Sequence, residues 1–165
     1  MPPDMALCKT EEMRGLVGSA QRLMGLDVGK KTIGIATCDA GWRIATAHSI
    51  LRRSKFTADM DVLFTLITEL GDIGGLVIGW PVNMDGSEGP RCDATRDFAH
   101  ALMRKRAEMG LDDLPIAFHD ERLSTEAVER AMLEGDLTRQ RRHDRRDALA
   151  AAWILQGFID GNRGD

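Results

Sequence analysis

The chain has 165 residues, the length of one ordinary domain, and 43% of them are hydrophobic, enough for one buried core. Two-lobed proteins such as sugar kinases need roughly 250 to 400 residues, so that class is disfavoured. The longest apolar run, Ala148 to Leu155, is far shorter than the roughly 18 residues that a membrane span needs. The first 20 residues contain Asp4, Glu11 and Glu12 and no apolar core of a signal peptide. These features predict a soluble cytoplasmic protein without a membrane partner.

The cysteines and histidines give no sign of a disulfide framework or a zinc site. There are three cysteines, an odd number, and none is in C-x-x-C spacing. The four histidines show no ligand spacing with one another or with the cysteines, which disfavours zinc-dependent hydrolysis. The residues concerned are Cys8, Cys38, Cys92, His48, His100, His119 and His143.

Charge is distributed unevenly along an acidic chain. The net charge is −4, from 22 Lys and Arg against 26 Asp and Glu, so bulk charge does not indicate a nucleic-acid binder. Six acids and no Lys or Arg lie between Phe56 and Pro90. Five arginines then follow within eight positions, at Arg139, Arg141, Arg142, Arg145 and Arg146. Such a cluster is either a solvated surface loop or a basic patch that contacts a substrate.

The N-terminal half of the chain predicts strands followed by one helix. Residues 1–21 lack sustained periodicity and are expected to form a flexible extension, leaving a single domain over 22–160 and a tail over 161–165. Residues 23–28 and 32–37 are predicted as two strands around a tight turn, with a third strand over about 43–51. Apolar residues then recur every three or four positions from Met60 to Leu70, which predicts a helix that Gly71 ends.

The C-terminal half alternates strands and helices. Residues 75–79 and 115–119 are predicted as short buried strands, separated by a turn-rich loop over 80–90 and a helix over about 92–108. Ser124 is the expected N-cap of a helix to about Glu134, and the last helix is expected to start near Asp144. The order β-β-β-α-β-α-β-α-α predicts an α/β fold in which helices cover a mixed sheet.

Two acids fall where ligand sites lie in such folds, at the carboxyl ends of strands. Asp27 interrupts an otherwise apolar strand near its end, where a carboxylate is costly without a partner or a metal. Its alternative role is an edge-strand acid that faces water or pairs with Lys30 or Lys31. Glu121 follows the last predicted strand, and a solvated turn explains it equally well.

A third acid, Asp147, opens a very apolar helical stretch. If Asp144 caps this helix, Asp147 lies in its first turn, where acids complement the helix dipole. Alternatively it faces the carboxyl edge of the sheet. Hydrolysis of phosphodiesters at neutral pH commonly uses two Mg²⁺ ions, which prefer carboxylate oxygens. Asp27, Glu121 and Asp147 have the right chemistry to supply them.

Four ordered blocks give the sequence a specific likeness. They begin at Asp27 (DVGKKTIGIA), Val77 (VIGWPVNMDGS), Asp120 (DERLST) and Asp147 (DALAAAWILQ). Together they resemble the YqgF family, the bacterial RuvX-like pre-16S ribosomal RNA nucleases once described as Holliday junction resolvases. The resemblance runs from about Leu23 to Ile159. It departs from the family pattern at Trp80, where a leucine is expected, and in the longer N-terminal extension.

The resemblance implies a ribonuclease H-like fold, in which a mixed central sheet is flanked by helices. It also implies that Asp27, Glu121 and Asp147 are the metal-binding catalytic triad, with Mg²⁺ or Mn²⁺ as cofactor and two ions bound. The expected activity is metal-dependent endonucleolytic hydrolysis of structured nucleic acid, processing the 5′ end of precursor 16S ribosomal RNA. Pre-ribosomal particles are an expected partner, and the protein is expected to be a monomer or a weak dimer.

Further residues are expected to contact the substrate. The resemblance favours phosphate contacts for the cluster Arg139 to Arg146, because it immediately precedes a metal ligand. Lys30, Asn83, Ser124 and Thr125 are the other expected substrate-binding residues. A tight turn explains the Asp85-Gly86 part of the Asn83 loop equally well.

Three other functions are alternatives to this interpretation. A Holliday junction resolvase would need a symmetric dimer for paired cuts. A non-catalytic nucleic-acid-binding module in transcription or ribosome assembly would not need the three acids. A phosphotransferase is suggested by the likeness of Asp27 to Thr32 to the first phosphate loop of sugar kinases, but the chain has no second such loop and no second lobe.

Overall fold

The computed structural model describes residues 12–18, 20–83, 85–121 and 139–161, and over 139–147 it describes the backbone alone. The helix expected after Ser124 lies outside these residues. Within them, no helix combines the length and apolar character that a membrane crossing requires.

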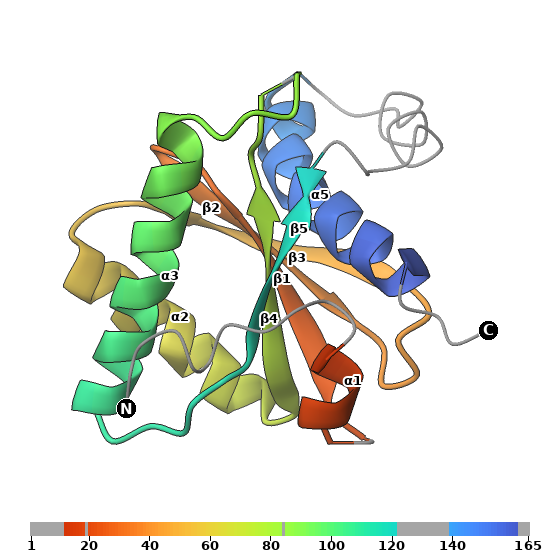
Figure 1. The fold of residues 1–165 in the computed structure, drawn as a ribbon, viewed down its shortest axis with the longest axis vertical. Coiled ribbons are helices and arrows are strands. Elements are labelled where there is room, and N and C mark those ends of the chain that lie inside the picture. Colours follow the sequence, from red (N-terminus) through yellow and green to blue (C-terminus); the bar gives the residue numbers. More distant parts are fainter. Residues whose placement is uncertain (1–11, 19, 84, 122–138, 162–165) are drawn as a thin grey trace.

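One five-stranded mixed sheet forms the centre of the fold (Figure 1). Its strands are β1 (Arg22–Val28), β2 (Thr32–Cys38), β3 (Ala45–Arg52), β4 (Ile73–Trp80) and β5 (Ile116–Asp120). Their order is β3-β2-β1-β4-β5. β1 pairs antiparallel with β2 and parallel with β4, and β4 pairs parallel with β5, so the carboxyl ends of these three parallel strands share one edge.

Helices cover both faces of this sheet. α2 (Phe56–Leu70) and α3 (Pro90–Glu108) pack on one face, and α5 (Arg139–Gly161) crosses the other (Figure 1). α2 ends where Gly71 adopts a left-handed φ of 79°, as the glycine predicts. The predicted α/β class, a mixed central sheet with flanking helices, is confirmed.

Side-chain alternation along β1 divides the core into two layers. Met24 and Leu26 pack into the layer beneath α2 and α3, whereas Leu23 packs on the α5 side. Gly25 also faces α5, and a Cβ atom there would lie 2.8 Å from Leu155 Cβ and 2.9 Å from the Ala151 carbonyl oxygen. The missing side chain therefore allows the backbone of α5 to rest on the middle strand.

Part of the expected N-terminal extension is folded against this core. α1 (Met13–Leu16) is a single short helix, and both Met13 and Val17 are buried in the layer beneath α5. Trp42 connects this segment to the sheet, because its indole N–H donates to the Gln21 carbonyl oxygen at 2.9 Å. The segment from residue 12 onward thus differs from the expectation of a flexible extension.

The last helix begins earlier than its apolar pattern indicates. α5 starts at Arg139, so the prediction of a start near Asp144 is wrong and the alternative in which Asp144 caps the helix is excluded. Asp144 lies inside the helix, and Asp147 is more than two turns from its start instead of in the first turn. The arginine cluster is accordingly on a helix and not in a loop.

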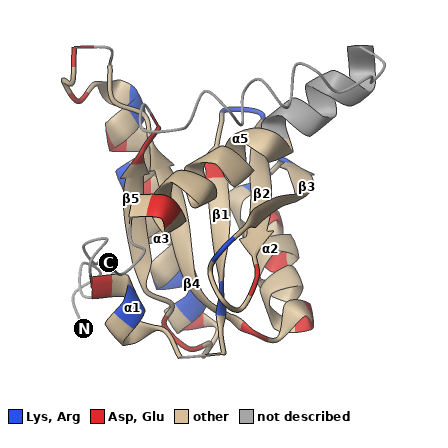
Figure 2. Cartoon of the chain, turned by 90° about the vertical axis from the view of Figure 1, so that its right-hand side faces the viewer, with Lys and Arg blue, Asp and Glu red and all other residues tan. Residues whose placement is uncertain are grey.

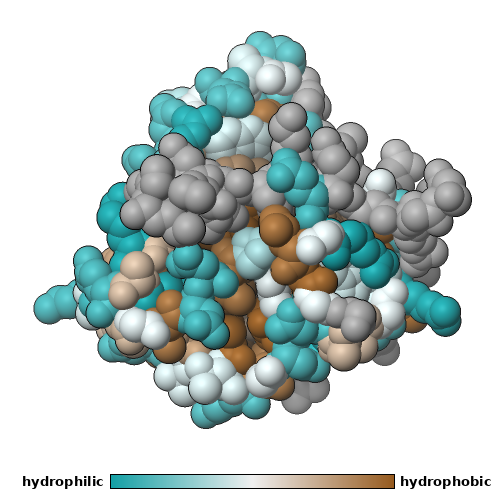
Figure 3. All heavy atoms as spheres, turned by 60° about the horizontal axis from the view of Figure 1, so that its bottom comes forward, coloured by the Kyte–Doolittle hydropathy of each residue, from teal (hydrophilic) through white to brown (hydrophobic). Residues whose placement is uncertain are grey.

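The surface at the amino ends of β1, β4 and β5 is partly apolar. α1 lies on this side of the molecule, and apolar residues gather near its centre between hydrophilic ones (Figure 3). Leu16 of α1 is 56% exposed. The acids of interest lie at the other edge, where β1, β4 and β5 end.

Candidate active site

Two carboxyl groups meet at the carboxyl edge of the sheet. Asp27 is the penultimate residue of β1, and Glu121 directly follows β5. Their side chains are hydrogen-bonded to each other, and both are partly buried. The alternative of an edge-strand role for Asp27 is excluded, because β1 is the middle strand of the sheet. Glu121 is likewise not a solvated turn residue.

The pKa of Glu121 is strongly raised. Burial, and next the negative charge of Asp27, raise the pKa of Glu121 to about 7 from an ordinary 4.5. The charge of Arg91 acts in the opposite direction and favours ionised Glu121. Two partly buried carboxyl groups that share a proton near neutral pH form a site where a cation can take the proton's place.

Gly79 of β4 makes room for the contact between Asp27 and Glu121. A Cβ atom on Gly79 would lie 2.7 Å from Glu121 Oε1 and 2.5 Å from Ile154 Cδ1. β4 lies between β1 and β5 in the sheet, so the Glu121 side chain lies against this glycine. Any larger residue would collide with both the carboxyl group and α5.

The third predicted ligand is carried by α5. Position 147 lies one helical turn before Ala151, whose carbonyl oxygen approaches Gly25. From this contact, β1 runs on toward its carboxyl end at Asp27. The preceding turns of α5 lie toward the same edge of the sheet (Figure 1). The backbone path of α5 is therefore compatible with a third acid at this edge.

The loop after β4 is held together by its own polar groups. The Asn83 amide nitrogen donates to Ser87 Oγ at 3.0 Å, and Ser87 Oγ donates to Asp85 Oδ1 at 2.6 Å. The Gly86 N–H also donates to the Asn83 carbonyl oxygen at 2.9 Å. Asn83 is exposed, so its predicted substrate contact would come from a residue that also shapes the loop.

Trp80, which departs from the family pattern, is covered on its aromatic surface. Its ring centroid lies 4.6 Å from that of Phe118, and Arg96 Cζ lies 5.1 Å from the Trp80 ring. Arg96 is fixed in turn by Glu88 at 3.2 Å and Asp93 at 3.4 Å. The bulky residue thus packs against the side chains of Phe118 and Arg96.

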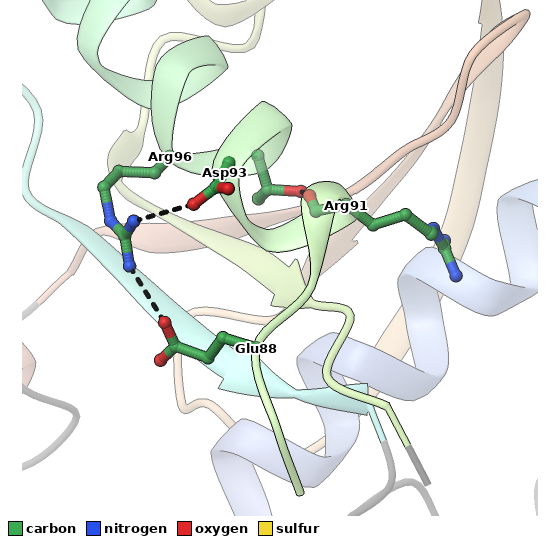
Figure 4. Close-up of polar contacts among 5 residues, drawn as sticks. Glu88, Arg91, Asp93 and Arg96 are labelled. Atoms are coloured by element: carbon green, nitrogen blue, oxygen red, sulfur yellow. Dashed lines mark hydrogen bonds and ion pairs between the residues drawn. The ribbon is translucent and has the colours of Figure 1, made fainter.

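Arg91 is a residue near the site that sequence motifs did not indicate. It stands in the first turn of α3 and is exposed. Its side chain points away from the Glu88–Arg96–Asp93 network and toward the α5 side (Figure 4). The only signal in the sequence is its place directly after the turn-rich loop, which any solvated arginine could share.

The structure describes only some of the other predicted substrate-binding residues. Lys30 is exposed in the turn between β1 and β2. This turn lies at the carboxyl edge of the sheet (Figure 2). Ser124 and Thr125 lie outside the described residues. The cluster from Arg139 to Arg146 occupies the first turns of α5, where the structure describes the backbone.

Comparison with known proteins identifies the family. The model of the family described as "RuvX: Holliday junction resolvase" matches residues 21–161. A protein of Paramagnetospirillum magneticum named "Putative pre-16S rRNA nuclease" is 48% identical over 97% of this chain and 99% of its own length. One of the same name from Phenylobacterium zucineum is 52% identical over 84% of this chain and 85% of its own. The chain belongs to the RuvX (YqgF) family, which confirms the predicted resemblance.

Among solved structures, the chain is similar to a T. thermophilus RuvC in complex with a Holliday junction substrate. The TM-score is 0.48 and the identity is 10%, with 86% of this chain and 95% of that chain covered.

Proposed function

We propose that this chain is a divalent-metal-dependent endonuclease that hydrolyses phosphodiester bonds in structured nucleic acid. The hydrogen-bonded carboxyl pair of Asp27 and Glu121 carries this proposal. A carboxyl group with a perturbed pKa at the end of parallel strands is the typical setting of a catalytic centre in an α/β fold. The family membership of the chain supports a nuclease over an unrelated hydrolase.

The donor set suits a hard cation. Asp27 and Glu121 offer carboxylate oxygens, which Mg²⁺ and Mn²⁺ prefer. Burial, and next the neighbouring charge of Asp27, raise the pKa of Glu121, and a bound cation would offset both effects. Asp147 is the proposed third ligand. Bound divalent ions, two in our proposal, would supply the positive charge that makes water nucleophilic and stabilises the leaving oxygen.

The protein's own residues then have separate roles. Gly79 leaves space for Glu121, and the α5 backbone on Gly25 fixes the helix that carries Asp147. The cluster Arg139 to Arg146, together with Lys30, Asn83, Ser124 and Thr125, is proposed to contact the nucleic acid. Arginine contacts to phosphates position the backbone without reading its sequence.

We infer that the substrate is RNA, the 5′ end of precursor 16S ribosomal RNA, encountered in pre-ribosomal particles. The names of the relatives support this choice. Holliday junction resolution is the second candidate, because the family model is described by that activity. A carboxylate site holds the scissile phosphate of either polymer, so 2′-hydroxyl contacts made by other residues must distinguish them.

Cleavage assays on matched substrates test the proposal. Purified protein is incubated with a labelled precursor RNA fragment or a four-way DNA junction, in Mg²⁺, Mn²⁺, Ca²⁺ or chelator. We expect cleavage of the RNA with Mg²⁺ or Mn²⁺, little with Ca²⁺ and none with chelator, and loss of at least about a hundredfold in Asp27→Asn. Wild-type rates in a folded Asp27→Asn protein, or activity after exhaustive chelation, would contradict the metal-nuclease proposal. Paired nicking of the junction with intact RNA would favour the resolvase.

A further inference from the structure

A second feature of the carboxyl edge is a hollow on the α2 and α3 side of the sheet. It has a volume of about 460 Å³ and lies between the end of β1, the segment before α2 and the first turns of α3. Its apolar lining includes Val28, Phe56 and Phe98. Its charged lining consists of three cations and one acid, namely Lys30, Arg53, Arg91 and Asp97.

Arg53 is a fixed cation in this hollow. Its Nη1 donates to the Gly29 carbonyl oxygen at 2.7 Å, and its Cζ lies 5.6 Å from the centre of the Phe98 ring. The backbone N–H of Arg53 also donates to the Lys31 carbonyl oxygen at 2.8 Å. These contacts hold the turn that carries Lys30 against α3. The side of the hollow that contains Lys30 and Arg53 is therefore already formed without a ligand.

Arg91 connects the hollow with the carboxyl pair. It lines the hollow, yet its charge also acts on Glu121, so the two sites adjoin at the edge of the sheet. Within the described part of the chain, no hydrogen bond or ion pair engages its guanidinium group. The start of α3 adds the partial positive charge of a helix N-terminus.

We propose that this hollow binds a phosphate group of the nucleic-acid backbone at a position away from the scissile bond. Lys30, Arg53 and Arg91 would contact the phosphate, and the adjoining sugar would pack against Phe56 and Phe98. Arg53 and Arg91 were not among the residues that sequence motifs indicated. The proposal rests on the proposed function, because it deepens the binding side of the same site.

The proposed occupant follows from the chemistry of the lining. A site with three cations and one acid favours an anion, and guanidinium groups match phosphate oxygens in geometry. The hollow opens at the same edge as the carboxyl pair, but on the opposite face of the sheet from α5. A backbone that crosses this edge would therefore place one phosphate near the acids and another in the hollow.

Binding measurements isolate this contact from catalysis. All proteins carry Asp27→Asn, so that nucleic acid stays intact in Mg²⁺. The test variant adds Lys30→Gln and Arg91→Gln, and Arg53 is retained because it supports the turn. The control variant adds Arg43→Gln and Arg104→Gln, which remove the same charge from exposed positions away from the hollow. The affinity of each protein for an RNA hairpin and for a DNA hairpin of the same sequence is measured over a range of salt concentrations.

We expect the test variant to bind about tenfold or more weakly at 0.1 M salt, with a log–log salt slope lower by about 1 to 2. The control variant should keep the slope of the parent. Single methylphosphonate substitutions then locate the contact, since each removes the charge of one phosphate. At least one such substitution away from the cleaved bond should weaken binding of the parent and leave binding of the test variant unchanged.

The outcomes separate the two proposals. Equal slopes for the test and control variants, or equal sensitivity to every methylphosphonate, would overturn the phosphate site while leaving the nuclease proposal intact. Failure of the parent to bind either hairpin would overturn both. A changed slope with DNA alone would keep the phosphate site and move the substrate class to DNA.

Discussion

Asp27 of β1 and Glu121, directly after β5, share a hydrogen bond although β1 and β5 are not neighbours in the sheet. β4 lies between β1 and β5, and the contact crosses it where Gly79 offers no side chain. Adjacent parallel strands lie about 4.8 Å apart, so two strands separated by a third bring short side chains together only over an empty position. The hydrogen bond between the two acids therefore requires a glycine at position 79.

Replacement of Gly79 by alanine should therefore damage the site more than the fold. The added Cβ would lie 2.7 Å from Glu121 Oε1 and 2.5 Å from Ile154 Cδ1, so the glutamate and α5 must shift. We expect a loss of stability of about 1 to 3 kcal/mol and a fall in Mg²⁺ affinity and cleavage of at least about tenfold. Calorimetric titration and denaturation measure both effects. Gly15→Ala, where nothing lies within 4 Å, is the control, and an unchanged Mg²⁺ affinity in Gly79→Ala would refute the prediction.

The raised pKa of Glu121 predicts how stability depends on pH in the absence of metal. Between pH 4.5 and about 7 the folded state holds a proton on Glu121 that the unfolded chain has released, so stability falls as pH rises through this range. The loss should amount to about 1 to 3 kcal/mol. Urea denaturation with chelator at pH 5 and pH 8 measures it.

A pair of variants assigns this pH dependence. Glu121→Gln should lose it, whereas Glu69→Gln, at an exposed site on α2, should keep it. Added Mg²⁺ should restore stability at pH 8 in the wild type and not in Glu121→Gln. A pH dependence that persists in Glu121→Gln would assign the effect to another group.

Asp147 and Asp144 form a matched pair for testing the third ligand. Both lie within α5 and three residues apart, so an Asn substitution at either has a similar effect on helix propensity. We expect Asp147→Asn to reduce cleavage at least about a hundredfold and Asp144→Asn by less than about threefold. Single-turnover cleavage of the precursor RNA gives the rates, and circular dichroism checks the fold. Equal losses would show that the third ligand has been assigned to the wrong residue.

The arginine cluster should contribute binding energy that salt screens. Changing Arg139, Arg141, Arg142, Arg145 and Arg146 to Ala keeps helix propensity high while removing five charges. Each lost phosphate contact lowers the log–log salt slope by up to about 0.9 on duplex DNA. The variant with Arg43→Gln and Arg104→Gln, which loses two charges at exposed positions, shows how much the slope changes per charge removed elsewhere on the surface. Should the five-residue variant keep the parent slope, the cluster is a solvated helix surface.

The sequence allowed the carboxyl edge to be predicted because its signals are local. An acid inside an apolar strand and an acid directly after a strand specify their own positions, and parallel pairing brings strand ends together. Gly71 ended a helix for an equally local reason, its left-handed φ. The role of Gly79 could not be predicted, because it depends on a contact between Asp27 of β1 and Glu121 after β5 that crosses β4.

The start of α5 and the burial of α1 escaped prediction for a different reason. Apolar periodicity marks the part of a helix that packs, and α5 becomes apolar only at Ala148, well after its start at Arg139. α1 has four residues, too few to show any period, yet Met13 is fully buried. Arg91 and Arg53 also lack a pattern, since their significance comes from the hollow that their elements enclose.

The position of Glu121 at the end of the last strand also sets when the site can form during synthesis. The ribosome delivers Asp27 early, but its partner acid emerges only after β4 and α3, and α5 with Asp147 follows later still. Domains fold largely as units as they emerge, so a nascent chain that ends before β5 has one acid of the pair and no completed edge. The nuclease proposed above would thus acquire its complete carboxyl site only when its own translation is almost finished.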